Sequence, residues 1–238
     1  MWLRIIFFLI TLLVNGTVHC VHASSDSLKA NIIQQRINQL STFLNSNKWM
    51  THPVSPINLP EPYNDLLTQP LLTPAIENYY KRTAIIRVIH THQSSNEHTY
   101  SRVITMHLDS NKERNDAKLA QNINEDLIVE LALITIYYRE LPQQFIRDII
   151  YSNIPFGTLL KNNHINTYST NRYYFSTSCN PELVQHIKCR LNTTLYGRLN
   201  TIVRVDNQQQ IAQVVELLSG LKCTNQQCDL ISTEQYFK

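Results

Sequence analysis

The sequence of Leu195–Leu218 is LYGRLNTIVRVDNQQQIAQVVELL. It begins at a Tyr-Gly-Arg corner, continues as an alternating segment, crosses a polar turn and ends in an apolar segment that contains one acid, Glu216. If the two segments pair as a hairpin, Glu216 lies among Ala212, Val214 and Leu218, its neighbours at strand spacing. A carboxylate among such neighbours is costly unless a cation pairs with it. We therefore expect another part of the chain to supply that cation.

The same residues also fit a helix. Ile211, Val214, Val215 and Leu218 follow the i, i+3, i+4, i+7 spacing, and Gly220 stands where a helix C-cap would stand. In a helix at Gln210–Ser219, Glu216 would lie on a solvated face without a chemical role. Periodicity alone leaves both structures open.

The composition narrows the classes of protein to consider. With 238 residues, 43% of them hydrophobic, the chain is long enough for one domain with a sizeable core. The net charge is +3 and the basic residues are scattered, so we expect no nucleic-acid partner. With only 4 Gly and no P-loop, HExxH or GxSxG motif, the sequence lacks the common nucleotide, zinc-protease and serine-hydrolase signatures.

The first 23 residues predict a signal peptide. Arg4 precedes the apolar run Ile5–Val14, and Val21-His22-Ala23 has the small-x-small pattern of a cleavage site. We therefore expect a secreted or exported protein, extracellular or periplasmic, with no membrane association after signal removal. The alternatives are an uncleaved anchor, for which the apolar run is short, and a lipoprotein at Cys20.

Cysteine usage agrees with export, because an even number of cysteines follows the signal: Cys179, Cys189, Cys223 and Cys228. Three pairings are possible, and the two local ones, Cys179–Cys189 and Cys223–Cys228, are the simplest. A zinc site is the competing interpretation, although the spacings are not those of CxxC pairs. Asn192-Thr193-Thr194 is a glycosylation sequon that matters if the source is a eukaryote.

Hydrophobic patterning predicts one α+β domain at 71–238, preceded by an N-terminal helix and a proline-rich connector within 24–70. The helix spans Ser24–Asn45 and buries Leu28, Ile32, Leu40 and Phe43; the connector continues to Pro74 and is extended. We expect a mostly antiparallel sheet with helices packed on one side. The remaining predicted strands are Thr83–His92, Arg102–Leu108, Leu127–Tyr138 and Thr167–Ser178. Helices are predicted from Leu141 and at Thr158–Asn162, a short helix or loop at Pro181–Lys188, and a loop at Asp109–Asp126.

Four motifs follow one another in the C-terminal half. They are Pro155-Phe156-Gly157-Thr158-Leu159-Leu160, Thr170-Asn171-Arg172-Tyr173, Tyr196-Gly197-Arg198 and Val214-Val215-Glu216-Leu217-Leu218. Their order resembles that of the chorismate pyruvate-lyase family, whose fold is shared by effector-binding domains of some bacterial transcription regulators. The resemblance implies a strand–turn–strand structure for Leu195–Leu218.

The resemblance extends upstream to about Leu71. The family has a strand headed by an Arg, which Arg102-Val103-Ile104 matches. A second strand of the family returns into a Leu-Pro corner, which Leu131–Pro142 matches. Leu72-Thr73 resembles the hydrophobic-Thr pair that opens the substrate pocket of the family. This sequence departs from the family where Ser219-Gly220 follows the Glu strand in place of a Leu-Pro corner.

The resemblance implies removal of pyruvate from chorismate to give 4-hydroxybenzoate, without a metal or cofactor. Arg102 would clamp a carboxylate of the substrate and is the candidate cation for Glu216, which would face the oxygen end of the ring and act as acid or base. Leu72 and Phe156 would form apolar walls, and Gly157 would let the backbone approach the ring. Arg172 and Arg198 are second-tier candidates for holding either carboxylate.

Other interpretations stay open from the sequence. In one of them, Arg102 is an ordinary surface residue of its strand. Lys118 or Arg114 is then the basic residue that takes the essential position. His90 and His92 share a strand face, so a metal is conceivable although a third ligand cannot be named. The function that competes with the lyase is a monomeric binding module for a small aromatic or cyclic carboxylate, and a third is an exported structural protein on the same scaffold.

Overall fold

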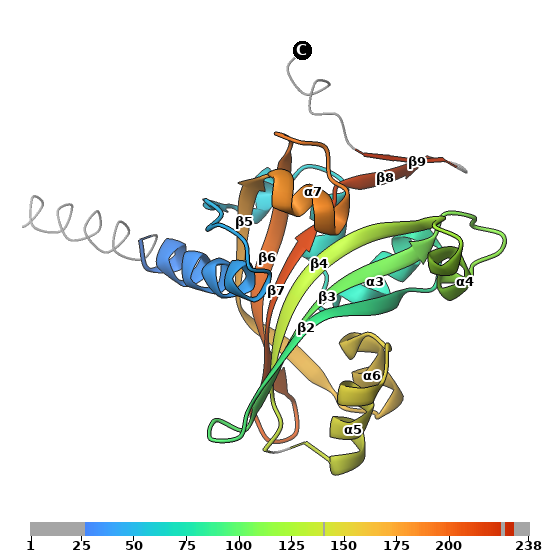
Figure 1. Cartoon of the computed structure of the whole chain (residues 1–238). Coiled ribbons are helices and arrows are strands. Elements are labelled where there is room, and N and C mark those ends of the chain that lie inside the picture. Colours follow the sequence, from blue (N-terminus) through green and yellow to red (C-terminus); the bar gives the residue numbers. More distant parts are fainter. Residues whose placement is uncertain (1–26, 140, 225–226, 231–238) are drawn as a thin grey trace, which may run out of the picture.

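A seven-stranded sheet forms the centre of the structure (Figure 1). This computed structural model describes residues 27–139, 141–224 and 227–230, and only the backbone at 223–230. All neighbouring strands are antiparallel, in the order β1-β5-β6-β7-β4-β3-β2. The predicted signal peptide at 1–23 lies outside the described residues. The strands are β1 His52–Val54, β2 Ile85–Ser94, β3 Thr99–Asp109, β4 Asp126–Tyr137, β5 Thr167–Ser178, β6 Thr194–Arg204 and β7 Gln210–Leu218.

The predicted hairpin is present as β6 and β7. Arg198 lies opposite Glu216 in the register, and Asn200 lies opposite Val214. The alternative of a helix at Gln210–Ser219 is wrong. Strand β7 is hydrogen-bonded to β4 on one side and to β6 on the other, and this central place in the sheet overrides the local helical spacing. The predicted α+β class with an antiparallel sheet is confirmed.

Four helices pack on one face of the sheet. Helices α2 and α3 cover Ile104, Met106 and Ala132, and helices α5 and α6 cover Ile134 and Val214. These sheet residues alternate along their strands, as expected where every second side chain points to the same face. The helices are α2 Tyr63–Leu67, α3 Leu72–Tyr80, α5 Gln143–Tyr151 and α6 Phe156–Asn162.

The opposite face carries the N-terminal helix (27–43) and α7 Pro181–Ile187, which pack on Val103, Leu131 and Leu133. The N-terminal helix was expected at Ser24–Asn45, and its described part agrees. Its buried stripe differs from the expected one, because Leu28 is 61% exposed. The buried residues of the stripe follow the spacing i, i+4, i+7; they are Ile33, Ile37 and Leu40.

Two predicted irregular segments contain secondary structure. The proline-rich connector 50–74 includes β1, a short 3-10 helix at Pro56–Asn58, α2 and the start of α3. The predicted loop Asp109–Asp126 contains α4 Ala117–Asn122, which Asp116 caps by accepting a hydrogen bond from the Leu119 amide. Such short helices depend on packing against the domain, so local patterning does not predict them.

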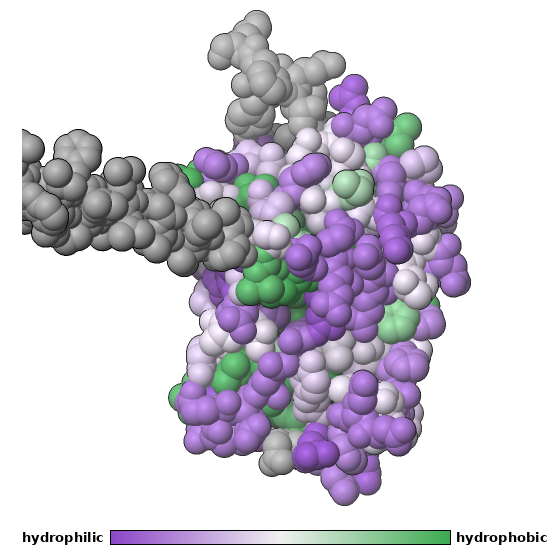
Figure 2. Space-filling view, turned by 90° about the vertical axis from the view of Figure 1, so that its left-hand side faces the viewer, coloured by the Kyte–Doolittle hydropathy of each residue, from purple (hydrophilic) through white to green (hydrophobic). Residues whose placement is uncertain are grey.

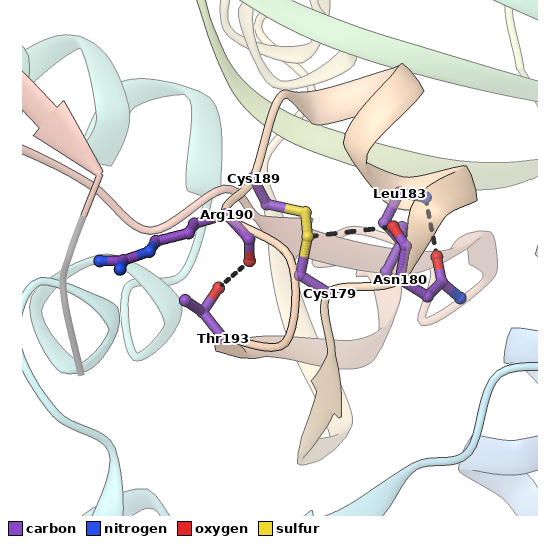
Figure 3. Close-up of a disulfide and its surroundings, with 6 residues drawn as sticks. All are labelled: Cys179, Asn180, Leu183, Cys189, Arg190 and Thr193. Carbon is purple, nitrogen blue, oxygen red and sulfur yellow. Dashed lines mark hydrogen bonds between the residues drawn. A yellow bond between two sulfur atoms is a disulfide. The ribbon is translucent and has the colours of Figure 1, made fainter. Parts of the chain in front are cut away.

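The predicted disulfide between Cys179 and Cys189 is present and links the end of β5 to the segment after α7 (Figure 3). Asn180 caps α7 by accepting from the Leu183 amide at 2.8 Å, and Thr193 Oγ1 donates to the Arg190 carbonyl at 2.6 Å. Asn192 of the glycosylation sequon is exposed and lies close to this disulfide in the sequence. Of the second predicted pair, the backbones of Cys223 and Cys228 lie opposite each other in the hairpin formed by β8 Leu221–Thr224 and β9 Gln227–Leu230, and their side chains lie outside the described residues.

The surface seen in Figure 2 is mostly hydrophilic, and apolar residues form only small, separate patches on it. Within the described ranges, no helix is both long and apolar enough to span a bilayer.

Gly197 is the position at which the sheet tolerates no side chain. A Cβ atom there would lie 2.5 Å from Cζ of Phe175, and closer still to the carbonyl oxygen of Glu216. Phe175 is fully buried and lies opposite Gly197 on β5. The glycine therefore lets the aromatic ring cover the strand directly beside Arg198.

We predict that Gly197→Ala lowers the free energy of unfolding by about 3 kcal/mol, because two buried neighbours must move to accommodate the methyl group. Urea unfolding followed by circular dichroism measures this loss. The matched control is Gly157→Ala on α6, where a Cβ atom would lie at an ordinary 3.5 Å from Thr73 Oγ1. The alanine should leave stability unchanged or raise it by up to about 1 kcal/mol through helix propensity. Equal losses in the two variants would contradict this account.

Candidate functional site

A cavity lies between the sheet and the first turns of α3 and α6. The open space inside it is about 50 Å³, small compared with the roughly 300–1,000 Å³ of typical small-molecule sites, so a ring-sized ligand would have to push its walls apart. Its walls include Leu72 and Thr73 from α3 and Phe156 and Gly157 from α6, all of them buried. The sequence predicted Leu72, Phe156 and Gly157 as substrate-binding residues, and the structure brings them together around this cavity.

Four adjacent strands form the floor of the cavity. Since the strands are about 4.8 Å apart and successive residues on one face are about 6.8 Å apart, the register fixes a grid of side chains. A row here is a set of side chains that lie opposite one another across the four strands. Arg102 stands in the first row, Glu216 and Arg198 in the second, and Glu130 in the third. In the order β3, β4, β7 and β6, the first row is Arg102, Ile134, Val214 and Asn200, the second is Ile104, Ala132, Glu216 and Arg198, and the third begins Met106, Glu130 and Leu218.

Glu216 forms a buried ion pair with Arg198. Nε of Arg198 donates to Oε2 of Glu216, and the two side chains are 1% and 10% exposed. Nη1 of Arg198 also donates to the backbone carbonyls of Leu67, at 2.7 Å, and Gln69. The pair therefore ties the segment after α2 to the central hairpin. The alternative of Glu216 on a solvated face is wrong.

The cation beside Glu216 is therefore Arg198, and the expectation that Arg102 supplies it is corrected. Arg198 is the direct cross-strand partner of Glu216. Arg102 belongs to β3, two strands and one row away, and this distance follows from the register rather than from the sequence pattern.

Arg102 is also buried, at 1% exposure, and is not an ordinary surface residue. Nη1 donates to the carbonyl of Ile149 at 2.9 Å, and Nη2 donates to the carbonyl of Ile154 at 3.4 Å. Nε has no hydrogen-bond partner, and no carboxylate in the described part of the chain forms an ion pair with this side chain. Burial lowers the pKa of Arg102 to about 10, so the guanidinium stays charged at neutral pH.

The C-terminal end of α5 provides part of the environment that Arg102 needs. Ile149 lies in the last turn of that helix, where carbonyl groups lack partners within the helix and carry the negative end of its dipole. These carbonyls hold the guanidinium in place without neutralising it. The cavity thus contains a fixed cation whose charge no described side chain balances.

Glu130 is the functional candidate that the sequence reasoning missed. It is 2% exposed and lines the cavity, and its Oε2 atom has no hydrogen-bond partner within the described ranges. Burial and the neighbouring charge of Glu216 raise its pKa well above the usual range, although Arg198 opposes the shift. The shift favours the neutral form of this carboxyl group. The signal that would have found it is a lone acid in the apolar run Leu127–Tyr138.

Two further predicted groups lie outside the cavity. Arg172 does not line it; its Nη1 donates to the carbonyl of Thr68 at 2.6 Å, at the end of α2. His90 and His92 contact the ring of Phe43 on the N-terminal helix, with ring centroids 4.9 and 5.9 Å apart. Across the described ranges, no group of three His, Cys, Asp or Glu side chains is arranged to hold a metal ion.

A polar chain of side chains lies on the opposite face of the sheet. Nδ1 of His107 lies 2.5 Å from Oδ2 of Asp126, and Nε2 lies 2.7 Å from Oγ1 of Thr105. Burial lowers the pKa of His107 despite the hydrogen bond to Asp126, so the imidazole is neutral, donates to Asp126 and accepts from Thr105. Thr105 is only 3% exposed in the middle of β3, and the chain serves to join β3 to the start of β4.

We predict that Glu216→Leu lowers the free energy of unfolding by about 3–5 kcal/mol, because it leaves the Arg198 guanidinium charged and buried without its partner. The double variant Arg198→Met/Glu216→Leu should be less destabilised than Glu216→Leu alone. Urea unfolding of wild type, both single variants and the double variant gives the coupling energy. Additive losses would show that the two side chains do not act as a pair.

Comparisons with known proteins give only distant likenesses. No protein-family model matches the chain, and no curated protein is similar to it in sequence. A gene product of Staphylococcus aureus superposes with a TM-score of 0.41 at 7% identity, over 64% of this chain and 89% of that one. The effector domain of PhnF from Mycobacterium smegmatis gives 0.41 at 8%, over 63% and 88%. The C-terminal domain of Yurk from Bacillus subtilis gives 0.35 at 13%, over 59% and 90%. At these scores the likenesses carry no argument about function.

Proposed function

We propose that this protein binds a small aromatic or cyclic carboxylate in the cavity, with Arg102 as the charge partner of the ligand. The observation that carries the proposal is the state of Arg102, which is 1% exposed, lines the cavity and has a free Nε donor. A buried charge without a counter-charge is costly, so its presence is explained by an anion that arrives with the ligand.

The surroundings of Arg102 specify the kind of anion. A guanidinium presents parallel N–H donors that match the two oxygens of a carboxylate. The side chains between the charged groups are apolar, with Ile104, Ala132 and Ile134 on the floor and Leu72 and Phe156 as walls. A flat ring would bury its faces against these groups while its carboxylate meets Arg102.

We predict that benzoate derivatives raise the melting temperature of the wild-type protein and that Arg102→Met abolishes this rise. A ligand at 100 times its dissociation constant stabilises the native state by about 2.7 kcal/mol. Removing one partner of a buried charge pair costs about 2–5 kcal/mol of binding free energy. Differential scanning fluorimetry over a range of ligand concentrations measures the effect.

Two controls make this experiment specific. Arg172→Met removes another guanidinium that donates to a backbone carbonyl, but it lies outside the cavity and should leave binding unchanged. The melting temperature of Arg102→Met without ligand should not fall, because the variant removes an unbalanced buried charge. If Arg102→Met binds as well as wild type, the proposed role of Arg102 is wrong.

A second candidate function is elimination of pyruvate from chorismate. The observation in its favour is that Arg102 and Glu216, the two residues to which the resemblance assigns the chemistry, line one cavity together with Leu72 and Phe156. The observation against it is the ion pair with Arg198, which already occupies one carboxylate oxygen of Glu216.

Incubation of the purified mature protein with chorismate tests the lyase. If the protein is a lyase, 4-hydroxybenzoate and pyruvate should form faster than the spontaneous background, and Arg102→Met should return the rate to that background. Chromatography of the products measures both. Product formation at the background rate would exclude this reaction and leave carboxylate binding as the function.

A further inference from the structure

Glu130 occupies the far end of the cavity from Arg102. The two residues lie two rows apart on neighbouring strands, so their Cα atoms are about 14 Å apart along the sheet. Val129, next to Glu130, is a β-bulge residue: Met106 pairs with Glu130 and His107 with Ile128, so Val129 has no partner on β3. Glu130 shares the cavity face of β4 with Ala132 and Ile134, and the bulge lies directly before it.

The charges around the cavity do not cancel. Two guanidinium groups, those of Arg102 and Arg198, and two carboxyl groups, those of Glu130 and Glu216, line it. Arg198 and Glu216 neutralise each other. Arg102 has no counter-charge among the described residues, and burial favours the neutral form of Glu130, so the cavity offers a charge partner for one carboxylate.

Among the described residues, two charged groups act on Glu130 at this end of the cavity. They are Glu216 of β7, the neighbouring strand, and Arg198 of β6, the next strand along. Helices α2 and α3 contribute the phenols of Tyr63 and Tyr80 to the hydrophobic cluster beside it. Burial raises the pKa of both phenols, so they stay uncharged.

We propose that Glu130 is a specificity-determining residue: the cavity selects a monocarboxylate that carries a hydroxyl group at its far end and rejects a dicarboxylate. This inference rests on the proposed binding of a carboxylate at Arg102. It concerns the opposite end of the same ligand, where Glu130 has an unpartnered oxygen.

The chemistry of the two carboxyl groups distinguishes a hydroxyl from other polar groups. A protonated Glu130 donates a hydrogen bond, whereas the ionised Glu216 can only accept one. A hydroxyl group both accepts and donates, so it satisfies both neighbours. A second carboxylate would face the charge of Glu216 without a free cation, and like charges so placed cost several kcal/mol.

The test uses three ligands that share one ring and one carboxylate: 4-(hydroxymethyl)benzoate, 4-(aminomethyl)benzoate and benzene-1,4-dicarboxylate. Their affinities for wild type, Glu130→Gln and Arg102→Met are measured by isothermal titration calorimetry between pH 5.5 and 8.5. We expect wild type at pH 6 to bind the hydroxymethyl compound at least about 30-fold more tightly than the dicarboxylate.

The pH profile separates a specific role of Glu130 from a structural one. The pKa of Glu130 is raised in the fold, so the donor is present at low pH and is lost as the pH rises through that pKa. Affinity of wild type for the hydroxymethyl compound should therefore fall with rising pH, by up to tenfold per unit. Glu130→Gln keeps a donor that does not titrate, so its profile should be flat.

Several outcomes would overturn the inference. Equal binding of the hydroxymethyl and dicarboxylate compounds would show that Glu130 does not select. Tightest binding of the aminomethyl compound would show that Glu130 acts as a carboxylate that holds a cation. If all three ligands bind through Arg102 and the two pH profiles coincide, only the role of Glu130 fails. If no ligand binds wild type, the proposed function fails as well. Should Glu130→Gln not fold, the ligand ranking and the pH profile of wild type still decide.

Discussion

The buried pair of Arg198 and Glu216 is the interaction on which the rest of the site depends. It joins the two strands of the central hairpin side chain to side chain, and through the carbonyls of Leu67 and Gln69 it also fixes the segment that leads into α3. A buried ion pair rarely adds net stability compared with an apolar pair of the same size. Its role here is positional, because it decides where the wall of the cavity stands relative to the floor.

Arg198 has a carboxylate partner, whereas Arg102 is buried without one, which lowers stability. Carbonyl groups from α5 and the following segment hold the guanidinium, but no described carboxylate balances it. Stability and function commonly oppose each other at binding sites, where groups must wait in a state that only the ligand completes. The buried carboxyl group of Glu130, whose Oε2 atom has no partner among the described residues, is a second group that waits for a ligand. The two ends of the cavity therefore differ: Arg102 offers a charge at one end, and Glu130 offers a hydrogen-bonding group at the other.

Strands β2 to β6, the N-terminal helix and helices α5 to α7 follow from hydrophobic patterning, whereas the partnerships within the site do not. Predicted strand Thr167–Ser178 coincides with β5, because β-branched and aromatic residues make up most of it. Periodicity could not choose between helix and strand for β7; the order of the motifs favoured the strand, and its central position in the sheet explains it. The partner of Glu216 was assigned wrongly because register, not sequence distance, decides which side chains meet. Glu130 carried the same signal as Glu216, an acid in an apolar strand, and was overlooked because no motif drew attention to it.

The origin of the cavity floor determines when during synthesis and folding the protein can first bind a ligand. Its four strands come from two hairpin-like halves of the chain, β3 and β4 from one and β6 and β7 from the other, with the walls supplied by α3 and α6. A nascent chain that ends before Gln210 lacks Glu216 and β7, the strand that joins the two halves. Ligand recognition is therefore a property of the finished sheet, and a bound ligand would report that synthesis and long-range strand pairing are both complete.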